Sequence, residues 1–430
     1  MGLIILFGVF AGTLCMGVPV AFAMAIAAVA GFWWEGVPLA VVFQQMTSGM
    51  NVFSLLAIPF FIFAGEIMLH GGIAQRLVDL AAAAFGWMRG GLGVMNVADS
   101  MLFGGISGSA VADVSALGSV VIPMMRKKGY DTDYAVNLTI TSSIAGIMIP
   151  PSHNMILYSL AAGGGVSVSA LFLAGFAPGV MMCLSLGVVA YVIARRRGYP
   201  AEPWQGFRWL ARCFVIALPG LLTAVIILGG VLSGVFTVTE SASAGACWAL
   251  FVTIAVYRQM SWAAFRQVLA TAVRTTSMVL LLVGAATAFG WLLALHRVPE
   301  LLLEAMTGLS SVPWVVFLLI NIVFLFLGCI MDMAALILIC TPIFLPVAQQ
   351  MGMDPVQFGM VMMMNLGLGL TTPPVGACLF VGCAIAKVRM ESVLSTIWPF
   401  WGAIFAALML TTYWPAMSLT LPRLALGYGG

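Results

Sequence analysis

Long apolar segments recur along the whole chain, and they constrain the fold more than any other feature. Of the 430 residues, 63% are hydrophobic and only 7% are charged. A helix crosses a hydrocarbon core of about 30 Å with roughly 20 apolar residues, and several runs reach that length. Backbone groups in lipid must be hydrogen-bonded internally, so the sequence predicts an all-α polytopic membrane protein and excludes soluble domain classes.

Hydropathy divides these segments into spans, interrupted stretches and interfacial helices. Two apolar stretches, about 91–125 and 312–346, are broken in the middle by Gly or Asp, and we interpret both as re-entrant helical hairpins. The segments 72–88 and 260–271 mix Arg, Gln and Trp with apolar residues, as is typical of interfacial amphipathic helices. The predicted simple spans are 3–31, 51–69, 132–163, 167–194, 207–232, 235–257, 272–296, 356–388 and 396–418.

The basic residues predict an orientation. With the N-terminus in the cytoplasm, all of the 17 Lys and Arg residues except Arg297 and Arg423 fall on the cytoplasmic side. Interpreting either interrupted stretch as a full span would invert everything after it, so this bias supports both hairpins. The apolar N-terminal run is long and has no basic region before it, which favours a first span over a cleaved signal.

The two halves of the chain share a pattern of Gly and Pro. A shift of 223 positions aligns Pro123, Gly129, Asp131, Gly146, Pro150 and Pro151 with Pro346, Gly352, Asp354, Gly369, Pro373 and Pro374. Each half has the order hairpin, polar turn, interrupted helix, and the hairpins would enter from opposite faces. We therefore predict an inverted repeat: 1–200 as the first repeat, 201–232 as a cytoplasmic linker and linking helix, and 233–420 as the second repeat.

Oxygen-bearing residues gather around these breaks. Half-helices that meet in a membrane present N–H groups at one end and free carbonyls at the other, and hard cations such as sodium prefer oxygen ligands. Pro150 and Pro151 remove N–H donors from carbonyls near Gly146 and Ile147. We interpret the two stretches as one transport site; the alternative is close helix packing with simple Pro kinks. The candidates are Gly104, Gly105, Ser107, Gly108, Ser109, Ser142, Ser143, Gly146 and Ser152 in the first half, and Gly328, Cys329, Asp332, Asn365, Gly369, Thr371 and Thr372 in the second.

Ionisable residues in apolar surroundings are further candidates. A charge at the bilayer centre costs on the order of 3 kcal/mol, so such residues usually have a partner or a role. The five carboxylates of this kind are Glu66, Asp99, Asp113, Glu240 and Asp332. The hairpin carboxylates Asp113 and Asp332 are the better functional candidates, either as ion ligands or as acceptors of N–H bonds at hairpin tips. The eight cysteines and three histidines have no metal-ligand spacing, and His153 is more typical of packing than of proton transfer.

Two pairs of motifs resemble a known family. GGISGSAVADVSALGSVVIPMMRKKGY with SSIAGIMIPPS, and FLGCIMDMAALILICTPIFLPV with NLGLGLTTPPVG, are similar to the large membrane (permease) subunit of tripartite ATP-independent periplasmic (TRAP) transporters. The resemblance covers nearly the whole chain. It implies an elevator-type, sodium-coupled importer in the bacterial cytoplasmic (inner) membrane that takes up organic acids such as sialic acid or C4-dicarboxylates.

The resemblance also implies ligands and partners. One sodium site would use Ser107, Ser109, Gly146, Pro150 and Ser152, and the other Gly328, Asp332, Gly369, Thr372 and Pro373; Ser142, Ser143, Asn154 and Asn365 are candidates for substrate contact. The implied partners are a small four-helix membrane subunit, which we expect to be a separate chain, and a periplasmic binding protein that delivers the substrate. Membrane lipid would surround the helices, and no nucleic acid is involved.

Three alternatives remain at this point. A single-component sodium/dicarboxylate or anion carrier with similar hairpins would work without a binding protein. An intramembrane enzyme with Asp113 and Asp332 as a carboxylate pair is disfavoured, because each Asp lies in its own repeat with no second catalytic group at a fixed spacing. A structural or channel subunit is disfavoured because hairpins closed at their tips imply alternating access.

Overall fold

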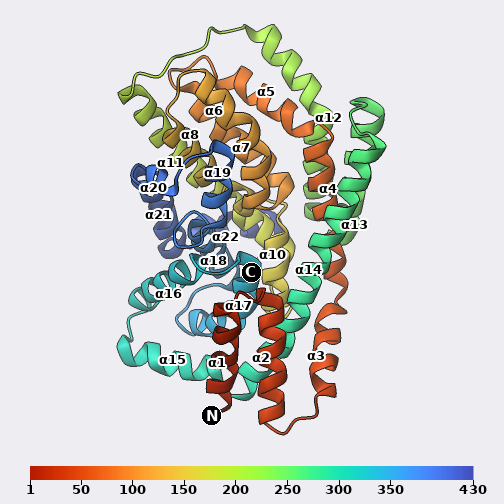
Figure 1. Cartoon of the computed structure of the whole chain (residues 1–430), viewed down its shortest axis with the longest axis vertical. Helices are drawn as coiled ribbons and strands as arrows, with labels where there is room; N and C mark the ends of the chain where they lie inside the picture. The colour runs from red at the N-terminus through yellow and green to blue at the C-terminus, as the bar shows by residue number, and fades with distance from the viewer. Residues whose placement is uncertain (430) are drawn as a thin grey trace.

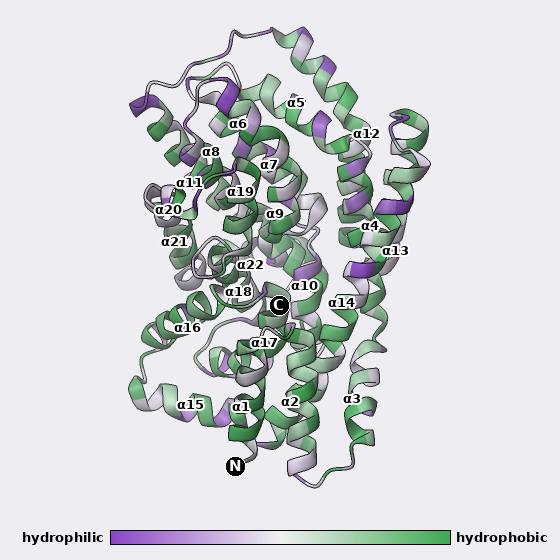
Figure 2. Ribbon diagram, in the orientation of Figure 1, coloured by the Kyte–Doolittle hydropathy of each residue, from purple (hydrophilic) through white to green (hydrophobic). Residues whose placement is uncertain are grey.

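All regular secondary structure in residues 1–429, the part that this computed structural model describes, is helical. Figure 1 shows an elongated bundle with the N-terminus at the lower end and the long loop before α12 at the upper end. Six helices are long and apolar enough to cross a membrane, or up to eight if each bent pair is one span. Figure 2 shows that hydrophilic residues are frequent around the upper loop, while the helix shafts are mainly hydrophobic. The predicted class of multi-span helical membrane protein is confirmed.

Four of the predicted spans begin and end close to the predicted positions. They are α4 (Ala57–His70, preceded by the 3-10 turn Phe53–Leu56), α11 (Val168–Arg196), α12 (Phe207–Leu232) and α13 (Val238–Phe251, continued by the π-helical turn Val252–Val256). The prediction of a separate interfacial helix at 260–271 is wrong. The Ser261 hydroxyl accepts the Ala264 N–H at 3.1 Å and starts α14 (Trp262–Leu295), and no Gly or Pro interrupts the following turns.

The predicted single span at 3–31 is also wrong. It is two short helices, α1 (Gly2–Cys15) and α2 (Val20–Trp34), which pack on each other. Gly17 adopts a positive φ of 80°, and Pro19 precedes α2 without an N–H, so the chain turns back between them. A methyl group added at Gly2 would meet both Glu35 and His296, so the start of α1 and the end of α2 lie at the same end of the molecule.

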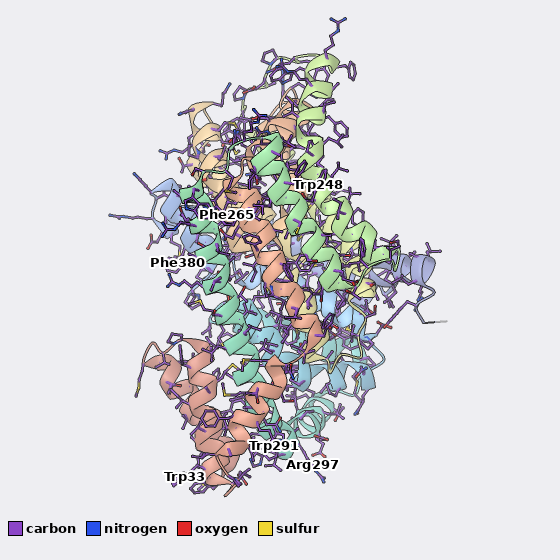
Figure 3. All side chains as sticks on the ribbon, turned by 90° about the vertical axis from the view of Figure 1, so that its right-hand side faces the viewer. Trp33, Trp248, Phe265, Trp291, Arg297 and Phe380 are labelled. Carbon is purple, nitrogen blue, oxygen red and sulfur yellow. The ribbon has the colours of Figure 1, made fainter. Side chains whose placement is uncertain are left out.

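This hairpin places the N-terminus at the same end of the molecule as Arg297. The Glu35 Oε1 to His296 Nε2 distance is 3.2 Å, and Figure 3 shows Trp33, Trp291 and Arg297 together at the lower end. Arg297 is one of the two basic residues that the charge pattern assigns to the outer face. The sequence predicts the N-terminus on the opposite, cytoplasmic face, so these two predictions are not compatible with this hairpin. From there α3 (Ala40–Met50) and α4 lead to the opposite end.

Both predicted hairpins are present as antiparallel helix pairs. The first is α6 (Gly91–Ser107) and α7 (Ala110–Lys127), and the second is α16 (Pro313–Gly328) and α17 (Met333–Gln350). The Ser109 hydroxyl accepts the Ala112 N–H at 3.4 Å, and the Asp332 carboxylate accepts the Ala334 N–H at 3.0 Å. A side chain at the tip therefore starts the second arm in both hairpins.

The interrupted helices break where the sequence predicts. The first consists of α8 (Thr132–Ser142), the single turn α9 (Ala145–Met148) and α10 (His153–Ala161); the second consists of α18 (Pro355–Gly369) and α19 (Ala377–Ala386). Both Pro–Pro bonds in the breaks are cis. The predicted span at 396–418 bends by 58° between α21 (Trp398–Tyr413) and α22 (Ala416–Leu426), where Pro415 interrupts the helix. The remaining helices are α5 (Ile73–Phe85), α15 (Val298–Leu309) and α20 (Met390–Leu394).

The repeat that the sequence shows is visible in the helix boundaries. A shift of 223 carries both ends of α7 onto both ends of α17, and the first residue of α8 onto that of α18. Asp131 and Asp354, which precede α8 and α18, correspond in the same way. The two halves also interlock, because α10 packs against α17 and α19 packs against α7.

Polar contacts hold the linker after α11 against the base of the first hairpin. The Pro200 carbonyl accepts the Gly90 N–H at 3.4 Å and the Tyr130 hydroxyl at 3.2 Å. The Glu202 N–H donates to the Gly86 carbonyl at 3.1 Å, and its carboxylate pairs with Lys128 at 2.8 Å. The linker is thus anchored up to Glu202, and α12 begins five residues later.

One ion pair next to this linker has a defined pH dependence. Arg197 donates from Nη1 and Nη2 to the two oxygens of Asp133 at 3.1 and 3.0 Å. Partial burial raises the pKa of the Asp133 carboxyl, but the hydrogen bonds from Arg197 and Thr396 and the charge of Arg197 outweigh it, so the net pKa is lowered. Because the folded pKa lies below the unfolded one, the stabilisation is present above the ordinary range of Asp and is lost as the pH falls through the lowered pKa.

We therefore expect Arg197→Met to lower the free energy of unfolding by about 1 kcal/mol near pH 7, as for a bidentate pair at a surface. The difference from wild type should shrink below about pH 4, where Asp becomes protonated. Thermal unfolding in detergent across pH 3–8 measures this. Arg196→Met is the matched control, since Arg196 has no salt bridge among the described residues; equal losses in both variants would contradict the assignment.

Candidate ion and substrate site

The first half of the candidate site is built on a backbone contact between two glycines. A Cβ added at Gly104 of α6 would lie 2.5 Å from the Cα of Gly146 in α9, closer than any side chain can approach. Further along the hairpin, a Cβ at Gly105 would lie 3.0 Å from the Pro150 carbonyl oxygen. Only glycine permits this approach, which seats the hairpin tip directly against the Pro–Pro break.

The tip and the break bring the predicted first-half ligands together. The Asn154 Nδ2 donates to the Gly108 carbonyl at 3.3 Å, and Gly108 also lies against Ser152 and His153. The hydroxyl of Ser152 is buried and has no hydrogen-bond partner among the described residues. Ser107 and Ser109 flank Gly108 at the same tip, and the Ser107 hydroxyl lies 3.5 Å from the Ser109 carbonyl.

The second half repeats this construction. A Cβ added at Gly369 of α18 would lie 2.6 Å from the carbonyl carbon of Gly328 in α16. The Val375 N–H donates to the Cys329 carbonyl at 3.0 Å, which fixes the second hairpin tip against the second break. The Thr372 hydroxyl donates to the Leu368 carbonyl at 2.9 Å, so its lone pairs remain available at the break.

The breaks provide both signs of partial charge. Pro150 and Pro373 lack an N–H, so the carbonyls of Gly146 and Gly369 lose the donors that a continuous helix would supply. The Gly369 carbonyl instead accepts the Thr372 N–H at 2.9 Å. On the other side of each break, α10 and α19 begin without a side-chain cap, and their first N–H groups face the break. Carbonyl and hydroxyl oxygens suit a hard cation, and exposed N–H groups at helix N-termini suit an anion such as a carboxylate.

The two breaks lie close to each other. The Ser143 hydroxyl of the first interrupted helix lies 3.9 Å from the Cys378 sulfur in the first turn of α19. Beside the second break, a cavity of about 350 Å³ is lined by Thr372, Trp398, Trp401 and apolar side chains of α16, α18 and α21. The first break is buried, whereas Asp332, Pro374 and Val375 at the second are exposed.

Two candidate substrate contacts form hydrogen bonds between helices. The Ser142 hydroxyl bonds with that of Ser100 at 2.9 Å between α8 and α6. The Asn365 Nδ2 donates to the side-chain oxygen of Asn321 at 2.7 Å between α18 and α16. Both are fully buried and join a hairpin arm to an interrupted helix, and their contact with substrate stays a prediction.

The carboxylates have different surroundings. Asp332 is exposed at the second hairpin tip, where it caps α17. Asp113 is fully buried between the helices of the first half rather than at the tip surface. Glu240 completes a capping box with Thr237 at the start of α13, and Glu66 lies 3.6 Å from His70 on α4, so neither belongs to the site. Trp401, which no sequence pattern marks, also borders the second break, and its indole donates to the Thr371 hydroxyl at 3.1 Å.

Comparison with known proteins identifies the family to which this geometry belongs. Residues 7–417 match the family model described as tripartite ATP-independent periplasmic transporter, DctM component. The chain is 44% identical to the uncharacterized protein YgiK of Salmonella typhimurium, covering 98% of this chain and 97% of that protein. It is 38% identical to the sialic acid TRAP transporter large permease protein SiaM of Vibrio cholerae, covering 97% and 98%.

Two further similarities concern a longer relative and the fold. The isethionate TRAP transporter permease protein DctMQ of Oleidesulfovibrio alaskensis is 35% identical over 96% of this chain, which corresponds to 65% of that protein. The solved structure of the Alcanivorax borkumensis YdaH transporter superposes with a TM-score of 0.66 at 13% identity, covering 89% of this chain and 90% of that one. At that identity the structural likeness shows the fold alone.

The glycine contacts give a direct prediction. Gly104→Ala and Gly369→Ala each place a methyl group within 2.6 Å of backbone atoms, so the hairpin must shift away from the break. We expect each to lower the free energy of unfolding by roughly 1–3 kcal/mol, as for overpacking, and to abolish uptake. Unfolding and transport of the reconstituted variants measure both effects. Gly187→Ala on α11, where nothing lies within 4 Å, is the control and should change neither; wild-type uptake by the two site variants would show that the contacts are dispensable.

Proposed function

The chain belongs to the DctM family of large permease subunits of TRAP transporters, and we propose that it imports a carboxylate-bearing solute by sodium symport. The family resemblance drawn from the paired motifs is confirmed by the match over residues 7–417. The chain is a transporter permease rather than an enzyme, and a multi-pass membrane protein of a bacterial transporter family. The cytoplasmic membrane is its proposed location.

The observation that supports symport is the matched pair of breaks. In each half, one glycine contact seats a hairpin tip against a Pro–Pro break, and each break combines backbone carbonyls with hydroxyl oxygens. Gly104 against Gly146 and Gly328 against Gly369 are two independent instances of the same construction. Two similar oxygen-rich sites, with no nitrogen or sulfur ligand required, suit two sodium ions better than one transition metal.

We assign the ligands as the resemblance implies. The first sodium ion would be held by oxygens of Ser107, Ser109, Gly146, Pro150 and Ser152, and the second by oxygens of Gly328, Asp332, Gly369, Thr372 and Pro373. The buried, unpartnered hydroxyl of Ser152 supports the first assignment. The substrate carboxylate would bind at the N–H groups that begin α10 and α19, within reach of Asn154 and Ser143.

The interlocked packing supports an elevator mechanism. Since α10 packs on the second hairpin and α19 on the first, the hairpins and interrupted helices form one unit that can move as a body. The long helices α4, α12, α13 and α14 would be the static scaffold. In this proposal 1–200 and 233–420 are the two inverted repeats, and 201–232 links them.

The family also suggests the partners. In the isethionate relative DctMQ, the sequence similar to this chain makes up 65% of the protein, which leaves room for a fused small subunit. We propose that this chain works with such a four-helix membrane subunit and with a periplasmic binding protein that supplies the substrate. Sialic acid and C4-dicarboxylates are the leading substrate classes, since relatives carry those names.

Reconstitution tests the function as a whole. We expect proteoliposomes containing this chain and its small subunit to take up substrate only with the binding protein present and with a sodium gradient directed inward. Uptake that does not depend on the sodium gradient would refute symport. Uptake by this chain alone would instead identify a single-component carrier. Replacing sodium with choline at equal osmolarity is the control for ionic strength.

Two substitutions test the sodium ligands. Ser107→Ala and Thr372→Ala each remove one hydroxyl oxygen from a proposed site, and the loss of one buried polar contact corresponds to about tenfold in affinity. We expect the sodium concentration for half-maximal uptake to rise by about that factor while yield and unfolding temperature stay near wild type. Ser185→Ala on α11, whose hydroxyl bonds only to Met182 of its own helix, is the matched control. Unchanged sodium dependence in both site variants would overturn the assignment.

A further inference from the structure

The interior between α6, α7 and α8 holds two carboxylates that the proposed sodium sites do not use. Asp99 on α6 and Asp113 on α7 are fully buried, and none of their four carboxylate oxygens has a hydrogen-bond partner among the described residues. The two helices pack on each other as the arms of the first hairpin, and Asp99 and Asp113 both lie within their shared interior. A buried carboxylate without a partner loses its charge by taking up a proton or is balanced by a bound cation.

A third acceptor oxygen faces the same interior. The Asn96 Nδ2 donates to Thr139 of α8 at 2.7 Å and lies 4.0 Å from the sulfur of Met125 on α7, so its side chain lies between the three helices. Its own carbonyl oxygen is buried and unpartnered. Asn96, Asp99 and Ser100 share one face of α6, because residues three and four apart on a helix are neighbours. All these unsatisfied groups accept hydrogen bonds, and none donates one.

The second half of the molecule shows that the fold itself does not require these charges. The 223-residue shift that carries α7 onto α17 places Leu336 at the position of Asp113. The stretch of α16 that corresponds to Asp99, residues 321–323, is Asn-Ile-Val, and Asn321 is satisfied by bonds to Thr412 and Asn365. The second hairpin therefore packs with neutral residues where the first has two carboxylates.

We propose that Asp99 and Asp113 bind one further monovalent cation of the size of sodium inside the first hairpin, separate from the sites at the two breaks. The donor set is anionic and consists only of oxygens, with the Ser100 hydroxyl close to Asp113. Asp113 lies in the first turn of α7. The partial positive charge at the N-terminus of this helix offsets part of the negative charge that remains when two carboxylates bind one monovalent ion.

The position of this site suggests a route for the cation. Asp79 on α5 is exposed at the basic end of the molecule, and α5 packs on α6, which carries Asp99. Asp79, Asp99 and Asp113 thus lie on successive packed helices between the basic end and the first hairpin tip, where Ser109 precedes α7. This inference goes beyond the proposed function, because it adds a cation that neither break holds.

A chemical labelling experiment on the unmodified full-length chain tests the site. A hydrophobic carbodiimide reacts with carboxyl groups in apolar surroundings, and peptide mass spectrometry reports each residue separately. We expect sodium to slow modification of Asp99 and Asp113 at least fivefold relative to choline at equal ionic strength. Glu66 on α4 is the internal control and should show no sodium effect. Equal labelling with and without sodium, equal protection of Glu66, or protection by calcium but not sodium would overturn the proposal.

A binding count gives a second readout. Saturation binding of radioactive sodium to the purified chain should fall by one ion per chain in the Asp99→Asn/Asp113→Asn variant. Glu240→Gln, which neutralises an exposed helix cap, should leave the count unchanged. An unchanged count in the double variant would refute the site. The two proposals can fail separately. If Ser107→Ala and Thr372→Ala leave the sodium dependence of uptake unchanged while the double Asp variant still binds one ion fewer, the sodium sites at the breaks are refuted and the site at Asp99 and Asp113 is supported.

Discussion

The structure depends on the close approach of backbone to backbone at two pairs of glycines. An interrupted helix inside a membrane exposes carbonyl and N–H groups that lipid cannot satisfy, so protein must cover it on every side. Gly104 against Gly146 and Gly328 against Gly369 bring a hairpin tip close enough to do so. The same contact keeps side chains out of the break and leaves its oxygens free for an ion. The same glycine contacts thus shield the break from lipid and leave room beside its oxygens for the proposed ion.

The two breaks are not equally covered. Gly105, Gly108, Pro150 and Ser152 at the first break are all buried, whereas Asp332, Pro374 and Val375 at the second are exposed. The two halves therefore share one construction but differ in how far their breaks are exposed. The cavity beside Thr372 lies at the more exposed break.

Sequence predicted the features that short-range chemistry determines. The hairpins, the breaks and the shift of 223 were recoverable because Gly and Pro restrict backbone shape wherever they occur. The N-terminal hairpin was missed because Gly17 and Pro19 stand within an apolar run that is long enough for one span, and hydropathy does not register a turn. The sequence does not separate substrate contact from helix packing at Ser142 and Asn365, because a polar residue near a break looks the same whether it faces a ligand or a neighbouring helix. Their partners, Ser100 and Asn321, are distant in the chain and become apparent only from the packing.

The anchored linker after α11 sets a mechanical limit. Pro200 is held by Gly90 and Tyr130 at the base of the first hairpin, and Glu202 is held by Gly86 and Lys128. Only residues 203–206 are then free to extend before α12 begins. Four residues of extended chain reach at most about 14 Å. The linker therefore limits how far the first hairpin can move from α12. A larger displacement first requires the hydrogen bonds at Pro200 and the contacts of Glu202 to break.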